Sequence, residues 1–392
     1  MFSFAITKKS KKSSARLGII KTSHGQIETP AFIGVATQGV IKTLDSKELK
    51  NAGLQAVISN TFHLHLKPGE EIISKNGGLN KYADLKFPTM TDSGGYQVFS
   101  LGFGRDYGTG KILKNKENEK ITQGHQPKNI TITENGVWFK SPINGSKIFI
   151  GPRESIKIQE KIGADIIFSF DECPSPLADY KYNQKALERT HNWARICLKE
   201  KKSDQAIYGI VQGGKFKDLR IQSAQFIGSL PFDGFGIGGE FGNNKKIMEK
   251  MIGWATKELP EEKPRHLLGI GKLEDIPKII KQGIDTFDCT IPTHYARHGY
   301  GFINKKTNIK NQNEKWRKYE KIDMNKTKYI DDSSPLDKSC DCYVCKTYTR
   351  SFLNHLIRAK EITGLKLLTF HNLYYFNKIV ENIRNEIKKG NF

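Results

Sequence analysis

Short apolar runs alternate with amphipathic segments along most of the chain, and this alternation predicts the fold. Between residues 180 and 202, for example, Leu187, His191, Ala194, Cys197 and Leu198 fall at helical spacing. Apolar strands that alternate with amphipathic helices are typical of a parallel sheet, and eight such units predict a closed α/β barrel, the (β/α)8 TIM barrel. The predicted strands are AVISN (56–60), PTMTD (88–92), DIIFSFD (165–171), AIYGIVQ (206–212), DGFGIGG (233–239), RHLLGIG (265–271), GIDTFD (283–288) and KLLTFH (366–371).

The predicted strands end in polar or small residues. Barrel enzymes place their catalytic groups at the carboxyl ends of the strands. Asp and Asn also end strands as turn formers or helix caps, but seven such residues in register favour an active site there. The seven are Asn60, Asp92, Asp171, Gln212, Gly239, Asp288 and His371.

Two regions interrupt the alternation. Residues 102–150 contain β-rich runs separated by two Asn-Gly pairs, which predict hairpin turns and an antiparallel β insertion after the second strand. Residues 303–335 are basic and irregular, and they predict an exposed strand-and-loop region that leads into a cysteine cluster. We expect one catalytic domain over residues 1–392, with the insertion at about 102–150 and a C-terminal zinc-binding subdomain at about 303–371.

The charge balance points to a polyanionic partner. The chain has 63 Lys and Arg residues against 41 Asp and Glu residues, a formal net charge of +22. Basic residues on phosphates release condensed counterions, although a composition biased toward lysine is the alternative explanation. No run approaches the roughly 20 apolar residues of a membrane span, and the basic N-terminus lacks the features of a secretory signal. We therefore expect a cytoplasmic protein.

Three of the six cysteines are close together. The spacing is Cys340-x-Cys342-x2-Cys345, and His371 follows 25 residues later. Three thiolates and one imidazole complete a tetrahedral zinc site without an open position, so we expect one structural Zn²⁺. It would fold a small subdomain and attach it to the last predicted barrel strand. The alternative is a set of free cysteines with an unrelated histidine.

Carboxylates and glycines at the predicted strand ends suit base recognition. Asp92 is followed by two glycines and Tyr96, an arrangement that combines bare backbone with a stacking surface. Asp171 can accept from the N1–H and N2–H₂ groups of guanine, and Gln212 or backbone N–H groups can donate to O6. Asp288 is a second separated carboxylate. Two such carboxylates can perform a retaining substitution at an anomeric carbon, where one attacks and the other handles the proton.

Taken together, these motifs resemble one known family. The chain resembles bacterial-type tRNA-guanine transglycosylase (queuine tRNA-ribosyltransferase) from about Ala15 to the C-terminal helix. The matching segments are ETPAFIGVAT (28–37), SNTFHLHLKPG (59–69), TDSGGYQ (91–97), FDEC (170–173), GIVQGG (209–214), GIGK (269–272), FDC-x3-T (287–293), CDCYVC (340–345) and LLTFHNL (367–373).

The resemblance implies a pentosyltransferase of queuosine biosynthesis. Its members exchange guanine at wobble position 34 of tRNAs with a GUN anticodon (Asp, Asn, His and Tyr) for a 7-deazaguanine, preQ1 or queuine. Double displacement through a covalent Asp-RNA intermediate retains the β configuration, and no nucleotide cofactor is required. The resemblance also implies a homodimer.

Site residues carry over position by position. Asp288 matches the nucleophile, and Asp92 matches the general acid/base. The implied base-binding residues are Ser93, Gly94, Gly95, Tyr96, Asp171, Cys173, Gln212, Gly238 and Gly239. The implied RNA-binding residues are Gly269, Ile270, Gly271, Lys272, Leu273, Glu274, Asp275, Thr293, His294, Tyr295, Ala296 and Arg297. The implied zinc ligands are Cys340, Cys342, Cys345 and His371.

The chain departs from the family pattern in three places. Glu240-Phe241-Gly242 replaces a Leu-Ala-Val-Gly-Glu type run beside the base, so preQ1 and queuine both remain open as substrates. His294 stands where an arginine is common, and the lysine-rich stretch 102–130 is longer than usual. Two other functions stay open: a tRNA-binding paralogue without catalysis, which the presence of Asp92 and Asp288 disfavours, and a relative that modifies DNA.

Overall fold

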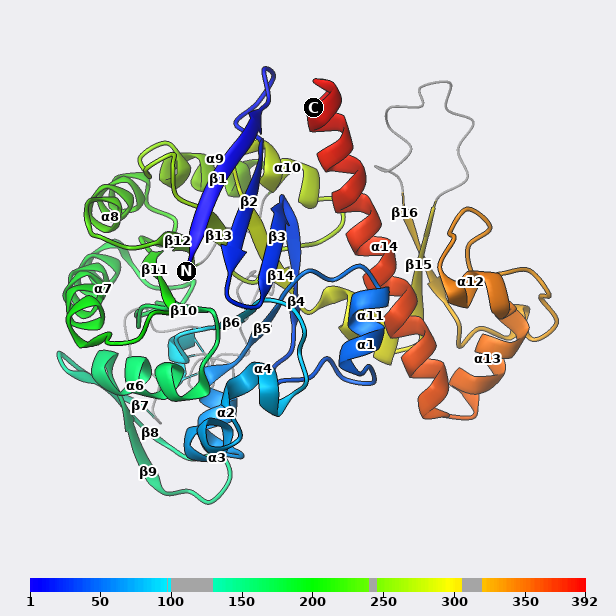
Figure 1. The fold of residues 1–392 in the computed structure, drawn as a ribbon, viewed down its shortest axis with the longest axis horizontal. Helices are drawn as coiled ribbons and strands as arrows, with labels where there is room; N and C mark the ends of the chain where they lie inside the picture. The colour runs from blue at the N-terminus through cyan, green and yellow to red at the C-terminus, as the bar shows by residue number, and fades with distance from the viewer. Residues whose placement is uncertain (97, 100–129, 240–244, 305–318) are drawn as a thin grey trace.

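The computed structural model describes the whole chain except residues 97, 100–129, 240–244 and 305–318. Eight parallel strands close into a barrel in sequence order, and the last strand pairs with the first (Figure 1). The predicted α/β barrel is therefore confirmed. The barrel strands are β4 (Ala31–Val35), β5 (Val57–Ser59), β6 (Thr89–Thr91), β10 (Ile166–Phe168), β11 (Ala206–Val211), β12 (Gly234–Ile237), β13 (Arg265–Leu267) and β14 (Thr286–Cys289).

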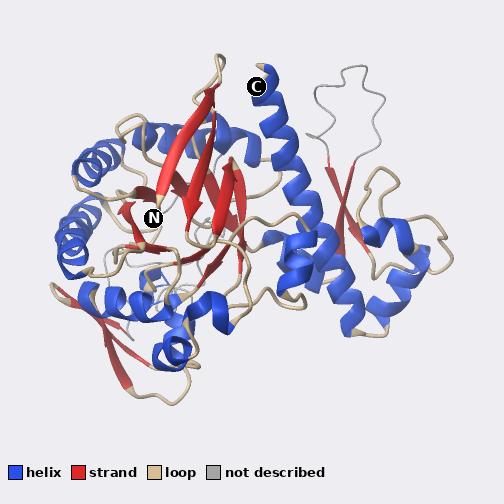
Figure 2. Ribbon diagram, in the orientation of Figure 1, coloured by secondary structure: helices blue, strands red, loops and turns tan. Residues whose placement is uncertain are grey.

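Helices surround the barrel on the outside (Figure 2). The long α7 (Tyr180–Glu200) covers the predicted helical segment, with Leu187, His191, Ala194 and Cys197 buried. The others described around the barrel are α1 (Ser46–Asn51), α2 (Thr61–Leu66), α3 (Glu70–Lys75), α4 (Gly78–Tyr82), α6 (Pro152–Ile162), α8 (Lys217–Ser229), α9 (Lys245–Thr256), α10 (Ile276–Lys281), α11 (Ile291–Arg297) and α14 (Ile362–Lys389). Among the described residues, no helix combines the length and apolar composition that a membrane span requires.

One predicted strand is wrong and one barrel strand was missed. Residues 366–371 lie inside α14, so His371 is not at a strand end, and the first strand of the barrel is instead β4. A short apolar run does not by itself distinguish a strand from a buried helix. Here the helix is buried on several sides, since Leu367, Leu368 and Phe370 are all buried. The alternation of apolar and polar faces that marks a surface helix is therefore weak in this segment.

An antiparallel sheet, which we did not predict, covers the amino-terminal end of the barrel. It consists of β1 (Ser3–Lys9), β2 (Arg16–Thr22) and β3 (Gly25–Thr29). Ile20 and Ile27 from this sheet join Ile33, Phe168 and Tyr208 from the barrel strands in one buried cluster. The sheet thus closes the end of the barrel opposite to the strand ends that carry the candidate chemistry.

The predicted antiparallel insertion is present. Its strands β7 (Ile130–Thr133), β8 (Gly136–Lys140) and β9 (Lys147–Ile150) form a three-stranded sheet. Asn135-Gly136 turns β7 into β8, and Asn144-Gly145 lies between β8 and β9, as the two Asn-Gly pairs predicted. The insertion follows the third barrel strand rather than the second, because β4 had been missed. The lysine-rich part at 102–129 lies outside the described residues.

The C-terminal subdomain lies beyond α14 from the barrel (Figure 1). It contains a hairpin of β15 (Tyr300–Asn304) and β16 (Tyr319–Asp323), the short 3-10 helix η2 (Thr327–Tyr329), and the helices α12 (Tyr343–Thr347) and α13 (Arg350–Arg358). Lys321 lies exposed on β16. The other basic residues of the predicted strand-and-loop region, from 305 to 318, fall outside the described part of the chain.

A buried ion pair attaches the N-terminal sheet to the barrel. Arg16 on β2 makes two hydrogen bonds to Asp285, from Nε to Oδ1 at 2.8 Å and from Nη2 to Oδ2 at 2.6 Å. Both side chains are at most 2% exposed. Asp285 also accepts from the Arg265 backbone N–H at 2.8 Å. This carboxylate precedes β14, so the pair connects the closing sheet to the strand that carries Asp288.

Replacement of Arg16 should destabilise the whole fold. We expect Arg16→Met to lower the free energy of unfolding by about 3–5 kcal/mol, because it leaves a buried carboxylate without its charged partner. Urea denaturation followed by circular dichroism measures the change. Lys9→Ala is the control, since Lys9 pairs with Glu261 at 2.7 Å but both side chains are more than half exposed, and it should cost less than about 1 kcal/mol. Equal losses in the two variants would contradict the role given to burial.

Candidate active site

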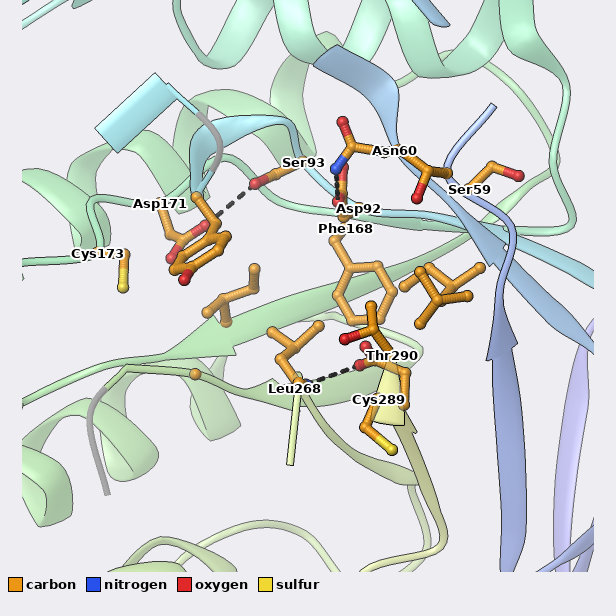
Figure 3. A pocket seen from close by; sticks show the side chains of 18 of the residues that line it. Ser59, Asn60, Asp92, Ser93, Phe168, Asp171, Cys173, Leu268, Cys289 and Thr290 are labelled. Atoms are coloured by element: carbon orange, nitrogen blue, oxygen red, sulfur yellow. Dashed lines mark hydrogen bonds between the residues drawn. The ribbon is translucent and has the colours of Figure 1, made fainter. Parts of the chain in front are cut away.

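A cavity of about 370 Å³ opens at the carboxyl ends of the barrel strands. Figure 3 shows Asp92 and Asp171 on one side of it and Leu268 and Cys289 on the other. The predicted site residues that line it are Asp92, Ser93, Tyr96, Asp171, Cys173, Gln212, Gly238, Gly239, Gly269 and Asp288. Residues from at least five different strand ends are thus brought together, as the barrel topology requires.

The Asp92 carboxylate is held by donors from two consecutive strand ends. Its Oδ2 accepts from Asn60 Nδ2 at 2.6 Å, and its Oδ1 accepts from the backbone N–H groups of Thr61 at 3.1 Å and Gly94 at 3.0 Å. Asn60 also caps α2 by accepting from the His63 N–H at 3.0 Å. Gly94 has a φ of +79°, which favours glycine at the turn. The position of Asp92 is therefore fixed by the same contacts that start α2.

Asp171 lies deeper and forms part of a side-chain network. Its Oδ2 accepts from Gln212 Nε2 at 2.6 Å, and its Oδ1 accepts from Ser93 Oγ at 3.1 Å. A Cβ on Gly95 would lie 2.8 Å from the Asp171 carbonyl oxygen, so this close approach requires glycine. Oε1 of the buried Gln212 has no hydrogen-bond partner among the described residues. A bound base with N–H donors would satisfy it.

Tyr96 supplies an aromatic wall. The side chain lines the cavity beside Asp171 and Cys173. Burial, and secondarily the nearby Cys173, raises the pKa of Tyr96 to about 12. The phenol is therefore neutral at pH 7, and it offers a stacking surface that carries no charge.

Asp288 lies one residue before the end of β14, and its carboxylate is 14% exposed. Its Oδ1 accepts from the Gly269 backbone N–H at 2.9 Å and lies 3.1 Å from Nε2 of His266. His266 was not among the predicted site residues. In the sequence, the only indication of its role was its position. His266 stands two residues before Leu268 on the predicted strand 265–271, and side chains two residues apart on a strand lie on the same face of the sheet.

Several other cavity residues were not predicted. They are Val35, Thr37, Ile58, Ser59, His63, Phe168, Ile210, Leu268, Cys289 and Thr290, whereas Asn60 had been predicted as a polar strand end. The segment SNTFHLHLKPG had been recognised as a match to the family, but its His63 had not been placed in the site. Burial, and then the charge of Lys42, lowers the pKa of His63. Apolar members such as Ile58 carry no chemical signal, and only the closed barrel shows that they face the cavity.

The two predicted RNA-binding segments are only partly accessible. In 269–275, Gly269 and Lys272 are exposed, whereas Ile270, Leu273 and Asp275 are buried. In 293–297, His294 is exposed and Tyr295 and Arg297 are half-buried. The exposed side chains can reach a ligand outside the cavity, and the buried ones support the backbone.

The β15–β16 hairpin contacts both segments. The Tyr319 hydroxyl donates to Glu274, and Lys321 Nζ lies 4.4 Å from the centre of the Tyr295 ring. The hairpin therefore couples the C-terminal subdomain to the surface beside the cavity.

The environment of His294 favours the neutral imidazole. Partial burial, followed by the neighbouring His298 and Arg297, lowers the pKa of His294.

The sulfur and nitrogen atoms of the predicted metal group converge. Cys340, Cys342, Cys345 and His371 place their ligand atoms within 4.8 Å of one another. The three Sγ atoms lie 3.8, 3.5 and 3.4 Å from His371 Nδ1. A tetrahedral zinc site with Zn–S of about 2.3 Å and Zn–N of about 2.0–2.1 Å implies nearly the same separations. These residues could therefore hold one metal ion.

The surroundings of His371 suit metal binding. Nε2 lies 2.6 Å from the carbonyl oxygen of Phe302 and can donate to it, which leaves Nδ1 as the ligand atom. The expected attachment to a barrel strand is wrong, because His371 belongs to α14. The metal group therefore joins α12, at Cys342 and Cys345, to the long C-terminal helix.

The fold and the cavity together define an α/β-barrel enzyme with several carboxylates at the carboxyl ends of its strands and a C-terminal subdomain whose Cys and His residues could hold a metal ion. The family model described as queuine tRNA-ribosyltransferase matches residues 10–392, and the chain belongs to that family of pentosyltransferases.

Curated relatives agree over nearly their full lengths. A queuine tRNA-ribosyltransferase of Roseiflexus sp. is 41% identical over 402 residues, which cover 99% of this chain and 96% of the relative. One of Halothermothrix orenii is 41% identical over 389 residues, 99% of this chain and 94% of its own. A relative from Archaeoglobus fulgidus, whose name refers to the same enzyme, is 43% identical over 386 residues, with 96% and 94% covered.

Loss of one metal-group cysteine should unfold the C-terminal subdomain. We expect Cys345→Ser to lose its bound metal and more than about 4 kcal/mol of stability, the scale of a lost structural metal. Metal content by mass spectrometry and thermal unfolding measure both effects. Cys197→Ala is the control: burial raises the pKa of this thiol to about 12, and it lies outside the group. A Cys345→Ser protein with unchanged metal content and stability would refute a structural role.

Proposed function

We propose that the chain exchanges guanine at position 34 of tRNAs with a GUN anticodon for a 7-deazaguanine, either preQ1 or queuine, in queuosine biosynthesis. The observation that carries the proposal is the presence of Asp92, directly after β6, and Asp288, on β14, in one cavity. Each accepts hydrogen bonds from neighbouring donors, and the base-binding candidates Tyr96, Asp171 and Gln212 line the same space. The relatives bear the name of this activity.

In the proposed mechanism Asp288 is the nucleophile. Its carboxylate attacks C1′ of nucleotide 34, the glycosidic bond breaks, and its electron pair leaves with guanine, which takes a proton from the carboxylic acid form of Asp92. The incoming base gives a proton to Asp92 and attacks C1′ from the opposite face, which breaks the ester and restores the Asp288 carboxylate. Two inversions retain the β configuration, and since one glycosidic bond replaces another, no nucleotide cofactor is needed.

Asp171, Gln212 and Tyr96 would bind the base. The Asp171 carboxylate would accept from N1–H and N2–H₂ of guanine. The second hydrogen of Gln212 Nε2, which does not bond to Asp171, and the Gly239 backbone N–H would donate to O6. Ser93, Cys173 and Gly238 line the same cavity. Gly94 and Gly95 are not among the residues that line it, and they would act through their contacts with Asp92 and Asp171. Tyr96 stacks on the ring with an uncharged face. The pocket segment 240–244 lies outside the described residues, so competition must decide between preQ1 and queuine.

The tRNA would contact the surface beside the cavity. Lys272 and His294 carry the exposed side chains of the two candidate segments, and Arg297 is half-buried. Position 34 must leave its stack to reach Asp288. We further propose that the metal is one Zn²⁺, held by the three thiolates and His371, and that the protein is a cytoplasmic homodimer with a single catalytic domain. The donor set supports zinc, and the family resemblance supports the dimer.

Labelled guanine tests the reaction. The protein is mixed with ¹⁴C-guanine and tRNA bearing a GUN anticodon, and label in the RNA is counted with and without preQ1 or queuine. Suppression by one deazaguanine at low concentration identifies the incoming base. Label in duplex DNA instead of tRNA would replace the proposal with DNA modification, and no label in either would leave a binding protein without catalysis.

Removal of the proposed nucleophile should separate catalysis from binding. We expect Asp288→Asn to slow exchange at least about 10³-fold, because the amide cannot form the covalent ester. Its Kd for tRNA should change less than about threefold, since phosphate contacts outside the cavity dominate RNA affinity. Filter binding and the exchange assay measure the two quantities. Exchange at a rate near that of the wild type would remove Asp288 from the mechanism.

A further inference from the structure

A histidine lies beneath the proposed nucleophile inside the barrel. His266 on β13 pairs with Thr286 on β14 in the parallel register, and Asp288 is two residues beyond Thr286 on the same face. The imidazole is completely buried. Its Nδ1 lies 2.9 Å from Thr286 Oγ1, and its Nε2 lies 3.1 Å from Asp288 Oδ1. The ring therefore connects two inward-facing side chains of the neighbouring strand.

The orientation of the ring is fixed from several sides. The Phe168 ring lies 5.5 Å away, between centroids, and it contacts Tyr208 in turn at 5.4 Å. Phe168 also lines the cavity. His266 thus ends an aromatic column in the barrel core, and it cannot turn away from Asp288 without disturbing that column.

The hydrogen bonds determine which nitrogen carries a proton. A carboxylate only accepts, so Nε2 must carry the hydrogen that points to Asp288. The Thr286 hydroxyl matches Nδ1 either as a donor to the neutral ring or as an acceptor from the charged ring. In both cases Nε2–H and the Gly269 N–H, at 2.9 Å, donate to the same carboxylate oxygen.

The charge of Asp288 changes during the proposed reaction. It is lost when the ester to C1′ forms and regained when the incoming base breaks that ester. A hydrogen bond to a charged acceptor is stronger than one to a neutral ester oxygen. A donor that remains in place throughout therefore stabilises the free carboxylate relative to the covalent intermediate, and it stabilises the carboxylate as a leaving group in the second displacement.

We propose that His266 is a positioning residue that makes Asp288 a better leaving group and so limits the lifetime of the covalent RNA intermediate. The inference rests on the proposed function, and it adds a residue that does not line the cavity. Nothing in the step is oxidised or reduced. The C1′–oxygen bond of the ester breaks, its electron pair returns to Asp288, and the proton of the incoming base goes to Asp92.

The test measures the intermediate directly. Wild-type protein is incubated with ³²P-labelled tRNA bearing a GUN anticodon, and the denaturant-stable protein–RNA adduct is separated on a gel. Excess guanine is then added, and the decay of the adduct is followed. We expect His266→Phe, which keeps a ring against Phe168, to raise the ratio of adduct to free enzyme about tenfold and to slow the decay of the adduct about tenfold. This factor corresponds to the difference in hydrogen-bond strength between a charged and a neutral acceptor.

Two further variants serve as controls. His266→Gln can place an amide N–H near the position of Nε2, so its adduct level and decay should stay within about twofold of the wild type. Thr286→Val removes the contact to Nδ1 and should give a smaller effect in the same direction as His266→Phe. If His266→Phe does not fold, as judged by thermal melting, His266→Met replaces it, because its flexible side chain fills the same space without a donor.

The outcomes separate this inference from the proposed function. A wild-type protein that forms no adduct contradicts the assignment of Asp288 as nucleophile. If the wild type forms an adduct and the donor-free variant matches it in level and decay, His266 has only a packing role. A variant with less adduct and slower exchange would also overturn the inference. A merely structural defect lowers both the adduct level and the exchange rate, whereas loss of the donor raises the adduct level.

Discussion

The active-site end of the barrel depends on keeping three carboxylates hydrogen-bonded in one cavity. Asp92, Asp171 and Asp288 come from β6, β10 and β14 and share a space of about 370 Å³. A carboxylate removed from water is costly unless donors replace its hydration. Each accepts hydrogen bonds from at least two neighbouring residues, and most of these donors belong to the turns that follow the strands. The loops at this end therefore have little freedom to vary.

The same groups serve local structure and chemistry. Asn60 caps α2 and also donates to Asp92. Ser93 Oγ donates to Asp171 and accepts from the Gly95 N–H at 3.2 Å. A rotation of either side chain would disturb a turn and a carboxylate together. In the segment TDSGGYQ, the acid, the hydroxyl and the glycines therefore each satisfy a separate geometric requirement within a few consecutive residues.

Much of the fold and the cavity could be predicted from the sequence, and the omissions have physical causes. Seven barrel strands and the polar residues at their ends could be identified because apolar runs stopped at turn-forming residues. β4 was missed because its run follows Pro30 and a strand of the closing sheet without such a break. Residues 366–371 were taken for a strand because α14 is buried on several sides. His266 was missed because a lone histidine in an apolar strand is usually a core residue, and only the register with Thr286 reveals its neighbour.

The position of His371 on a helix changes what the metal group supports. The next residue, Asn372, donates to the carbonyl oxygens of Pro292 at 3.0 Å and Tyr300 at 2.9 Å, and accepts from the Phe302 N–H at 3.0 Å. Pro292 lies in the first turn of α11, which carries His294, and Tyr300 begins the hairpin that contacts both candidate RNA segments. A barrel strand would have connected the metal to the cavity. Through α14 a bound metal would instead stabilise the surface beside the cavity, to which the proposed function assigns RNA binding, whereas the proposed chemistry lies in the barrel.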